Sequence, residues 1–440
     1  MDEAIFRSLN SPDRAVRFAA IDSLKTAAAG VNETPPRTEE VNNHVHTIYS
    51  FSPYSPAMAA FKAWQAGLKA VGIMDHDSIA GAGELLACCA ALRIGSTAGI
   101  EIRVNMNGTG LENKKINNPD SLNSAYIAIH GIPGPRLEEA AKFLRPINEA
   151  RNRRNRRETE RLSAILSGYG LGPLDFDKDV YPLSRAVEGG SITERHILAA
   201  LALRLEKTAG RGGGLAALLT QKLKVPVSGK LASYLSDADN PHYLYDVIGV
   251  LKGSFVERFY EDPDTDECVN VKEAVDFALS LGAIPAYAYL GDVTESPTGD
   301  KKAEKFEDDF LDELMPLLKN LGFKAVTYMP PRNTLPQLKR IQRCCKEFEL
   351  MEISGVDINS SRQIFNCPIV LKPDFVHLVD ATWALVAHEK LAGLDERYAL
   401  FSPRNPLAES PLAERLERYA AVGRAMDHGN PEKALEYVRF

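Results

Sequence analysis

The chain has 440 residues, a formal net charge of −7, 45% hydrophobic residues and 25% charged residues. This length allows one large or two ordinary globular domains with a substantial core. The negative charge gives no general attraction to nucleic acid or to an anionic membrane surface. No apolar run approaches membrane-spanning length, and the acidic first residues do not form a signal peptide, so we expect no membrane partner.

The six cysteines include two adjacent pairs, Cys88–Cys89 and Cys344–Cys345, and none shows C-x-x-C spacing. Both pairs fall within probable helices. They predict reduced core thiols in a cytoplasmic protein.

Residues 1–38 predict a helical N-terminal extension that ends in a linker. The segment Ser11-Pro12-Asp13 is typical of a helix start, with proline in the first turn. The extension is expected to pack on the rest of the protein or on a partner subunit, and we assign it no chemistry.

Three short apolar runs between residues 42 and 104 each carry polar side chains at or near their ends. The first run carries His44 and His46, which point to the same side of a strand because they are two residues apart. The second run, residues 70–74, is followed by the segment Asp75-His76-Asp77.

The third run carries Glu101. In parallel α/β folds, functional sites are built at the carboxyl ends of the strands. Imidazole and carboxylate groups together form the mixture that zinc, manganese and iron prefer, so the segment predicts a metal site.

These motifs resemble the PHP family, the polymerase and histidinol phosphatase superfamily of metal-dependent phosphoesterases. The similarity is closest to the stand-alone phosphoesterase branch and extends from about His44 to Asn359. It implies an α/β fold, a distorted (β/α)7 barrel that holds up to three metals at the carboxyl ends of its strands. Phe51 stands where the family usually has a metal-binding Asp or His, and Phe cannot bind a metal.

The first part of the barrel is expected to span residues 39–134. Within it, the polar tract 105–123 predicts a surface loop or an extended hairpin. The apolar run 125–129 predicts a strand that ends at His130, and the resemblance implies that His130 is a metal ligand.

Residues 135–275 predict a mostly helical insertion. Its segment Arg151–Arg161 is rich in arginine and allows two interpretations. The favoured one is a solvated helix face paired with acidic neighbours. The other is a surface that faces phosphate or nucleic acid.

The same insertion contains a helix near residues 190–205 that resembles the R-P-H-I-A motif of the family. His196 matches the ligand of that motif, while Glu194 and Arg195 depart from the usual Arg-Pro. Arg195 and Arg185 are candidate phosphate contacts, because a planar guanidinium suits a tetrahedral anion. Either arginine is equally consistent with a surface position.

The second part of the barrel is expected to span residues 276–365, followed by a helical C-terminal tail over 366–440. Tyr287 replaces the His of an Ala-His-Pro motif in the family. Asp357 matches the metal-binding Asp of the closing G-S-D-x-H motif, and Asn359 replaces its His.

The resemblance implies a ligand set for each ion. The first ion is expected to bind His44, His46, Glu101 and Asp357. The second ion is expected to bind Glu101, His130 and His196. A third ion would need Phe51, His76 and Asn359, of which two are unsuitable, so we expect about two divalent ions (zinc, manganese or iron) and a third position that is weak or empty.

The expected chemistry is hydrolysis by a metal-bridging hydroxide. His76 would then be free to donate a hydrogen bond or transfer a proton. Asp75 or Asp77 would orient ligand histidines, or Asp77 would instead cap the helix that begins near Ser78. Arg195, Lys114 or Lys115 are further candidates for stabilising the leaving group.

The leading prediction is therefore a metal-dependent phosphoesterase acting on a small phosphorylated metabolite. One alternative is a PHP-type nuclease or nucleotide phosphatase, supported only by the Arg151–Arg161 segment. Another is a non-catalytic metal- or ligand-binding relative, suggested by the replacements at Phe51, Tyr287 and Asn359. The substrate, the metal and the oligomeric state stay open.

Overall fold

The computed structural model of the protein describes residues 3–28, 37–118, 121–227, 229–292 and 307–440. Most of the linker expected at the end of the N-terminal extension lies outside these residues. Within the described ranges, no helix is both long and apolar enough to cross a membrane. The division into five segments stays a prediction.

Seven strands form a nearly closed barrel in the order β1-β2-β3-β4-β6-β7-β8, and the short strand β5 pairs with β3 beside it. The strands are β1 (Val41–Val45), β2 (Ala70–His76), β3 (Gly95–Asn105), β4 (Ser124–His130), β5 (Val269–Asn270), β6 (Ile284–Tyr289), β7 (Ala325–Tyr328) and β8 (Met351–Ser354). Most neighbouring strands are parallel, but β4 runs antiparallel to both β3 and β6. The prediction of a distorted α/β barrel is confirmed.

The barrel closes where the chain beyond β8 meets the end of β1. The main-chain nitrogen of His46 donates to the oxygen of Ile358 at 3.0 Å, and the nitrogen of Ile358 donates to the oxygen of His44 at 3.2 Å. Gly355 permits this approach, because a Cβ atom there would lie 2.5 Å from the Cβ of His44. The closure brings the segment that contains Asp357 next to β1.

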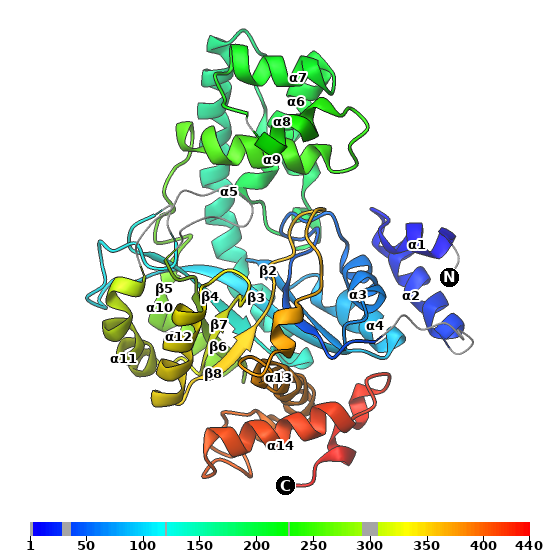
Figure 1. Ribbon diagram of the computed structural model, residues 1–440, viewed down its shortest axis with the longest axis vertical. Helices are drawn as coiled ribbons and strands as arrows, with labels where there is room; N and C mark the ends of the chain where they lie inside the picture. The colour runs from blue at the N-terminus through cyan, green and yellow to red at the C-terminus, as the bar shows by residue number, and fades with distance from the viewer. Residues whose placement is uncertain (1–2, 29–36, 119–120, 228, 293–306) are drawn as a thin grey trace.

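Five helices pack around the outside of the barrel: α3 (Pro56–Gln65), α4 (Ala82–Leu92), α10 (Val271–Ser280), α11 (Leu311–Leu321) and α12 (Leu335–Glu347). Helix α3 begins at Pro56, because the Oγ of Ser55 accepts the N–H of Met58 at 3.0 Å and proline is favoured in the first turn. Helices α1 (Glu3–Leu9) and α2 (Arg14–Ala28) of the N-terminal extension lie beside α3 and α4 (Figure 1).

The insertion between β4 and β5 forms a helical body with its own hydrophobic core. Its helices are α5 (Leu137–Gly168), α6 (Glu194–Ala209), α7 (Gly213–Ala217), α8 (Gly229–Ser236) and α9 (Tyr243–Ser254). Figure 1 shows these helices above one end of the barrel, with the long α5 reaching from the barrel into the insertion.

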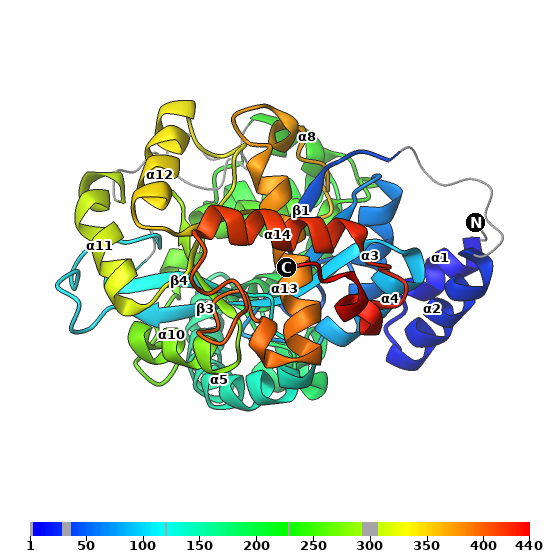
Figure 2. The ribbon, with the colours of Figure 1, turned by 90° about the horizontal axis from the view of Figure 1, so that it is seen from below.

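The C-terminal helices α13 (His377–Leu394) and α14 (Leu412–Ala425) cover the other end of the barrel (Figure 2). Helix α13 is mostly buried. It is tied to the strands by polar contacts, since Asn43 donates to the Oγ1 of Thr382 at 2.7 Å and Glu389 accepts the N–H of Ala98 at 2.5 Å. This end is therefore filled by a helix, and the carboxyl ends of the strands remain for a site.

Candidate metal centre

Neighbouring strands bring metal-competent side chains together at one end of the barrel. His44 lies in β1 and His46 follows it, His76 ends β2, Glu101 lies in β3, and Asp357 follows β8. His76 and Glu101 are directly paired in the parallel register of β2 and β3. The closure of the barrel thus brings Asp357, which follows the last strand, next to the histidines of the first strand. Folds of this kind build their sites at this end of the strands.

The side chains form two groups of three, and within each group the potential ligand atoms lie within 4.8 Å of one another. One group is His44, His46 and Asp357, and the other is His46, His76 and Glu101. The Oε2 of Glu101 lies 3.7 Å from the Nε2 of His44, 3.9 Å from the Nε2 of His46 and 3.1 Å from the Nδ1 of His76. The Nε2 of His46 lies 3.4 Å from the Oδ1 of Asp357. An imidazole nitrogen serves one ion, whereas a carboxylate can bridge two, so Glu101 is suited to the central position.

Ser50 and Asp75 orient the ring of His46. The Oγ of Ser50 lies 3.2 Å from the Nδ1 of His46 and donates its only proton to the Oδ1 of Asp75 at 2.6 Å. The Oγ of Ser50 therefore accepts a hydrogen bond from the Nδ1–H of His46. The Nε2 lone pair of the neutral ring then points toward the carboxylates of the site. Asp75 also accepts from the nitrogen and the Oγ1 of Thr47, each at 2.6 Å. Asp75 thus holds the loop after β1.

The pKa values of the rings reflect burial and the charges that surround each ring. Burial lowers the pKa of His44, but the carboxylates of Glu101 and Asp357 together outweigh burial, so the pKa lies above its ordinary value. Burial lowers the pKa of His46, and burial together with the charge of His46 holds the pKa of His76 well below its ordinary range. Neutral imidazoles beside buried carboxylates are the donor set of a divalent cation, so the residues present fit such an ion.

Asn359 holds the carboxylate of Asp357 in place. The Nδ2 of Asn359 lies 2.6 Å from both Oδ1 and Oδ2 of Asp357. Arg195 donates to the main-chain oxygen of Asn359 at 3.1 Å, and the main-chain nitrogen of Asn359 donates to Gln363 at 2.6 Å. Burial raises the pKa of Asp357, but the charges of His46 and of neighbours that include Arg195 bring it below the ordinary value. Arg195 thus lies beside the site and contacts the loop that carries Asp357.

His130 lies deeper in the barrel than Glu101, because β4 runs antiparallel to β3. In this register His130 pairs with Gly99, whereas Glu101 pairs with Ala128. Burial lowers the pKa of His130 to about 3, and its Nε2 has no hydrogen-bond partner in the part of the chain that the structure describes. Among the described residues it belongs to neither group of converging ligand atoms, and its role as a ligand stays a prediction.

His196 lies in the first turn of α6 and forms a capping box with Thr193. The Nδ1 of His196 accepts the N–H of Thr193 at 3.0 Å, so the neutral ring carries its proton on the buried Nε2, which has no partner among the residues described. Burial lowers the pKa of the ring to about 3. Metal binding through Nε2 requires the proton to move to Nδ1, where the Oγ1 of Thr193 at 3.3 Å is an acceptor. The ligand role of His196 also stays a prediction.

Phe51 packs against the insertion. Its ring centroid lies 4.9 Å from that of His196 and 5.8 Å from that of Tyr245 in α9. Its φ of 77° lies in the left-handed region, which is unfavourable for a bulky residue and persists only where the surroundings enforce it. The loop therefore presents a buried aromatic ring where a metal-binding side chain was expected from the resemblance.

Tyr287 anchors the chain that follows β6. Its hydroxyl donates to the Oε1 of Glu307, whose Oε2 accepts the N–H groups of Leu290 at 2.9 Å and Gly291 at 2.6 Å. Burial raises the pKa of Glu307 to about 8. Tyr287 therefore takes part in a structural polar cluster. Sequence reasoning missed Glu307, because no local pattern links it to β6.

A buried ionic network joins the insertion to the barrel beside the metal groups. Its arginines and carboxylates are Arg103, Arg151, Arg154, Asp77, Glu158, Glu194 and Glu267. Arg154 contacts Glu194 at 2.7 Å and Glu267 at 2.6 Å, and Arg103 contacts the same two carboxylates at 3.0 Å each. The sequence singled out the arginine segment but gave no sign that part of it is buried against Asp77 of the barrel and against carboxylates of the insertion.

The exposed arginines of the same segment are also paired. The pairs are Arg153 with Asp266, Arg156 with Asp177, and both Arg157 and Arg161 with Glu261. This arrangement agrees with the paired-surface interpretation of the segment.

Two other candidate anion contacts are engaged with carboxylates. Lys114 lies 3.0 Å from Glu313 on α11, and Arg185 lies 3.6 Å from Glu188. Arg195, in contrast, donates to the main-chain oxygen of Asn359 and so lies beside the metal groups.

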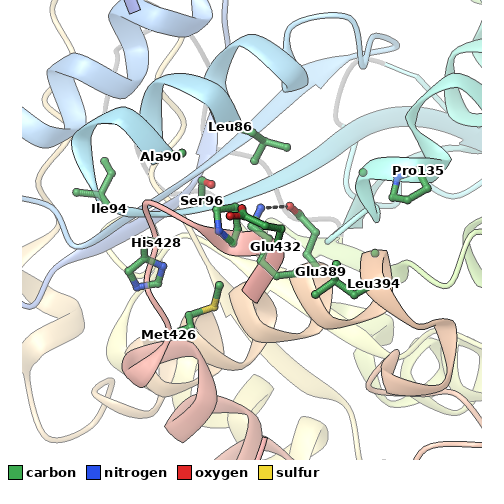
Figure 3. Close-up of a pocket in the computed structure, with 14 residues that line it drawn as sticks. Leu86, Ala90, Ile94, Ser96, Pro135, Glu389, Leu394, Met426, His428 and Glu432 are labelled. Atoms are coloured by element: carbon green, nitrogen blue, oxygen red, sulfur yellow. Dashed lines mark hydrogen bonds and ion pairs between the residues drawn. The ribbon is translucent and has the colours of Figure 1, made fainter. Parts of the chain in front are cut away.

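A cavity of about 220 Å³ lies between α4, α13 and the C-terminal segment (Figure 3). Its wall includes Leu86, Met426 and His428 and the ion pair between Glu389 and Lys390, whose charged atoms lie 2.5 Å apart. None of the residues of the two metal groups lines this cavity. The convergence of ligand atoms, and not this cavity, therefore marks the candidate site.

No protein-family model and no curated protein sequence matches the chain. Among solved structures, it is similar to a protein from Bifidobacterium adolescentis assigned as a metal-dependent phosphoesterase, with 18% identity and a TM-score of 0.49 over 80% of this chain and 98% of that chain. It is also similar to an amidohydrolase from Chromobacterium violaceum with bound sulfate and no metal, with 15% identity and a TM-score of 0.48 over 78% of this chain and 96% of that chain. Similarity at this level does not identify the chemistry of the protein.

Proposed function

We propose that the protein is a metal-dependent phosphoesterase that hydrolyses a small phosphorylated metabolite. The observation that carries the proposal is the convergence of imidazole and carboxylate groups at the carboxyl ends of four barrel strands. The converging residues are His44, His46, His76, Glu101 and Asp357. Buried charges of this kind are costly unless they are paired or bind a cation.

In the proposed centre, His44, His46 and Asp357 hold one divalent ion, and His76 contributes to a second. The carboxylate of Glu101 lies within 3.9 Å of a ring nitrogen of each of the three histidines and would help to hold both ions. This assignment adds His76 to the ligands, because its Nδ1 lies 3.1 Å from Glu101. When bound, the ions supply Lewis acidity, which polarises phosphoryl oxygens and activates water for attack.

The other residues of the site position these groups. Ser50 and Asp75 hold the ring of His46, and Asn359 holds the carboxylate of Asp357. The guanidinium of Arg195 brings a positive charge to the same end of the barrel, which favours an anionic substrate.

The insertion bounds the site and supports a small substrate. The loop after Asp357 is tied to α9 and the turn before it, where the Oγ of Ser361 lies 2.8 Å from the Nδ1 of His242. Arg362 of the same loop contacts Asp246 at 2.6 Å. The pairing of the arginine segment with carboxylates gives no support to a polynucleotide substrate.

A non-catalytic metal-binding protein is the second candidate. Phe51 and Asn359 occupy two positions at which the resemblance implies metal ligands, and the ring of Phe51 is packed against other side chains. Such a protein would retain metal binding and lack turnover.

The test combines metal content with a substrate screen. Protein loaded with zinc or manganese is assayed by elemental analysis and against a panel of phosphorylated metabolites. The wild type is compared with Glu101→Gln, which keeps the size of the side chain, and with Glu160→Gln on the exposed face of α5 as the matched control. We expect about two ions per chain and phosphate release, both lost in Glu101→Gln and retained in Glu160→Gln.

The possible results separate the candidates. A wild type that binds no metal would overturn the proposal. Metal bound through Glu101 with no hydrolysis across the panel would favour the non-catalytic candidate.

A further inference from the structure

Arg17 of the N-terminal extension is buried and fully hydrogen-bonded. Its side chain is 0% exposed, as is that of its partner Glu84 in α4. The Nε and one Nη donate to the two carboxylate oxygens of Glu84 at 2.8 Å and 2.9 Å, and the other Nη donates to the main-chain oxygens of Ser11 and Pro12. The guanidinium also contacts the hydroxyl of Tyr49 at 3.4 Å and the Oε2 of Glu188 at 3.8 Å. An arginine with all its donors used in a buried site fixes its partners in place.

Tyr49 belongs to the loop that follows the His44 and His46 pair. Its hydroxyl donates to the Oε2 of Glu188 in the insertion at 2.9 Å, and its main-chain oxygen accepts the N–H of Ser191 at 2.8 Å. The ring of Tyr49 is therefore held by the extension on one side and by the insertion on the other.

A second set of contacts fixes the far end of the same loop. Asn10, which directly follows α1, accepts the N–H of Ser55 at 2.7 Å and donates to the oxygen of Pro53 at 3.1 Å. The Oγ of Ser55 also donates to the main-chain oxygen of Leu9 at 2.5 Å. Loop 47–55 is thus bound to the extension at two separate points.

The next residue after Tyr49 is Ser50, the group that accepts the Nδ1 proton of His46 and donates to Asp75. We propose that the N-terminal extension is a positioning element of the metal centre, in which Arg17 acts through Tyr49 on Ser50 and so fixes the ring of His46. This inference rests on the proposed metal centre. It gives a role to a segment whose sequence contains no metal-competent motif.

The experiment uses variants of the full chain. Tyr49→Phe removes only the hydroxyl that joins Arg17 and Glu188. The double variant Arg17→Met/Glu84→Gln removes the arginine without leaving a buried carboxylate unpaired. Leu24→Ala is the matched control, since Leu24 is 1% exposed in α2 and is absent from this hydrogen-bond network.

Two properties are measured besides the melting temperature. Zinc affinity is obtained by competition with a chelator, and the tautomer of His46 is read from ring nitrogen chemical shifts of the metal-free, ¹⁵N-labelled protein. We expect Tyr49→Phe and the double variant to weaken zinc binding about tenfold and to give His46 a mixture of Nδ1–H and Nε2–H forms. We expect Leu24→Ala to lower the melting temperature with zinc affinity and tautomer unchanged.

The outcomes distinguish this inference from the proposed function. If the wild type binds zinc and both network variants bind it equally tightly with an unchanged His46 tautomer, the positioning role is wrong while the metal centre stands. If the wild type binds no metal, the proposed function fails, and the tautomer of His46 in the metal-free variants still decides whether the extension positions the ring. An effect of Leu24→Ala as large as that of Tyr49→Phe would also overturn the inference.

Discussion

The side-chain amide of Asn359 lies 2.6 Å from both carboxylate oxygens of Asp357. An amide nitrogen is a donor, so this contact uses Asn359 to orient the carboxylate and turns its only side-chain acceptor, Oδ1, away from it. Asn359 therefore supports a neighbouring ligand at a position where the resemblance implies a metal-binding His.

We predict that Asn359→Ala weakens metal binding severalfold, because Asp357 loses the hydrogen bonds that hold its carboxylate toward His46. Asn366→Ala is the matched control, since Asn366 lies in the same segment but donates to Ala66 at 3.1 Å. Zinc affinity measured by chelator competition checks the prediction. Equal affinity in the two variants would show that Asp357 needs no such support.

Ser50→Ala is expected to reduce zinc affinity about tenfold, since the Nδ1 proton of His46 loses its acceptor and Nε2 is no longer held free of a proton. Ser52 provides the control, because it is buried two residues away and its hydroxyl has no hydrogen-bond partner. Ser52→Ala should bind zinc like the wild type. A comparable loss in both variants would point to a general disturbance of the loop instead.

The metal content of two variants tests whether the second ion binds His76, which lies beside Glu101, or His196, which the resemblance implies. We expect His76→Ala to lower the number of ions per chain, because the Nδ1 of His76 lies 3.1 Å from Glu101. We expect His196→Ala to keep the wild-type number, because the Nδ1 of His196 accepts a main-chain N–H and its Nε2 therefore carries the proton. Elemental analysis of both variants checks this, and the opposite pattern would restore His196 as a ligand.

Local sequence patterns predicted the first half of the candidate site well. The spacing of His44 and His46 and the placement of His76 and Glu101 after apolar runs follow from strand geometry alone. The structure brings these four residues together as those patterns suggested. Such predictions succeed because each depends on a few consecutive residues.

Features that depend on contacts between distant segments were not accessible in this way. The reversed direction of β4 decides where His130 lies, and no residue in its sequence indicates that direction. Two of the partners of the buried Arg154, Glu194 and Glu267, come from other parts of the chain. The same is true of Arg17, whose contact with Tyr49 became visible only in the folded protein.

The buried pair of Tyr287 and Glu307 leads to a prediction about stability and pH. Burial raises the pKa of Glu307 from 4.5 to about 8, so the folded protein retains a proton there that the unfolded chain loses. The folded state thus binds more protons between these two values, and stability from this group is lost as the pH rises from about 4.5 to 8. Glu307→Gln imitates the protonated form, since its oxygen can accept the N–H groups of Leu290 and Gly291 and its nitrogen can donate to Tyr287.

We therefore expect Glu307→Gln to become progressively more stable relative to the wild type as the pH rises from 5 to 8, by an amount on the order of a few kcal/mol. The free energy of unfolding is measured by denaturant titration at several pH values. Glu313→Gln is the control, because Glu313 is exposed on α11 and its ion pair with Lys114 is open to solvent. Since the other titrating groups are common to all three proteins, the difference between variant and wild type isolates Glu307. Parallel pH profiles for Glu307→Gln and the wild type would show that Glu307 is ionised in the folded protein throughout this range.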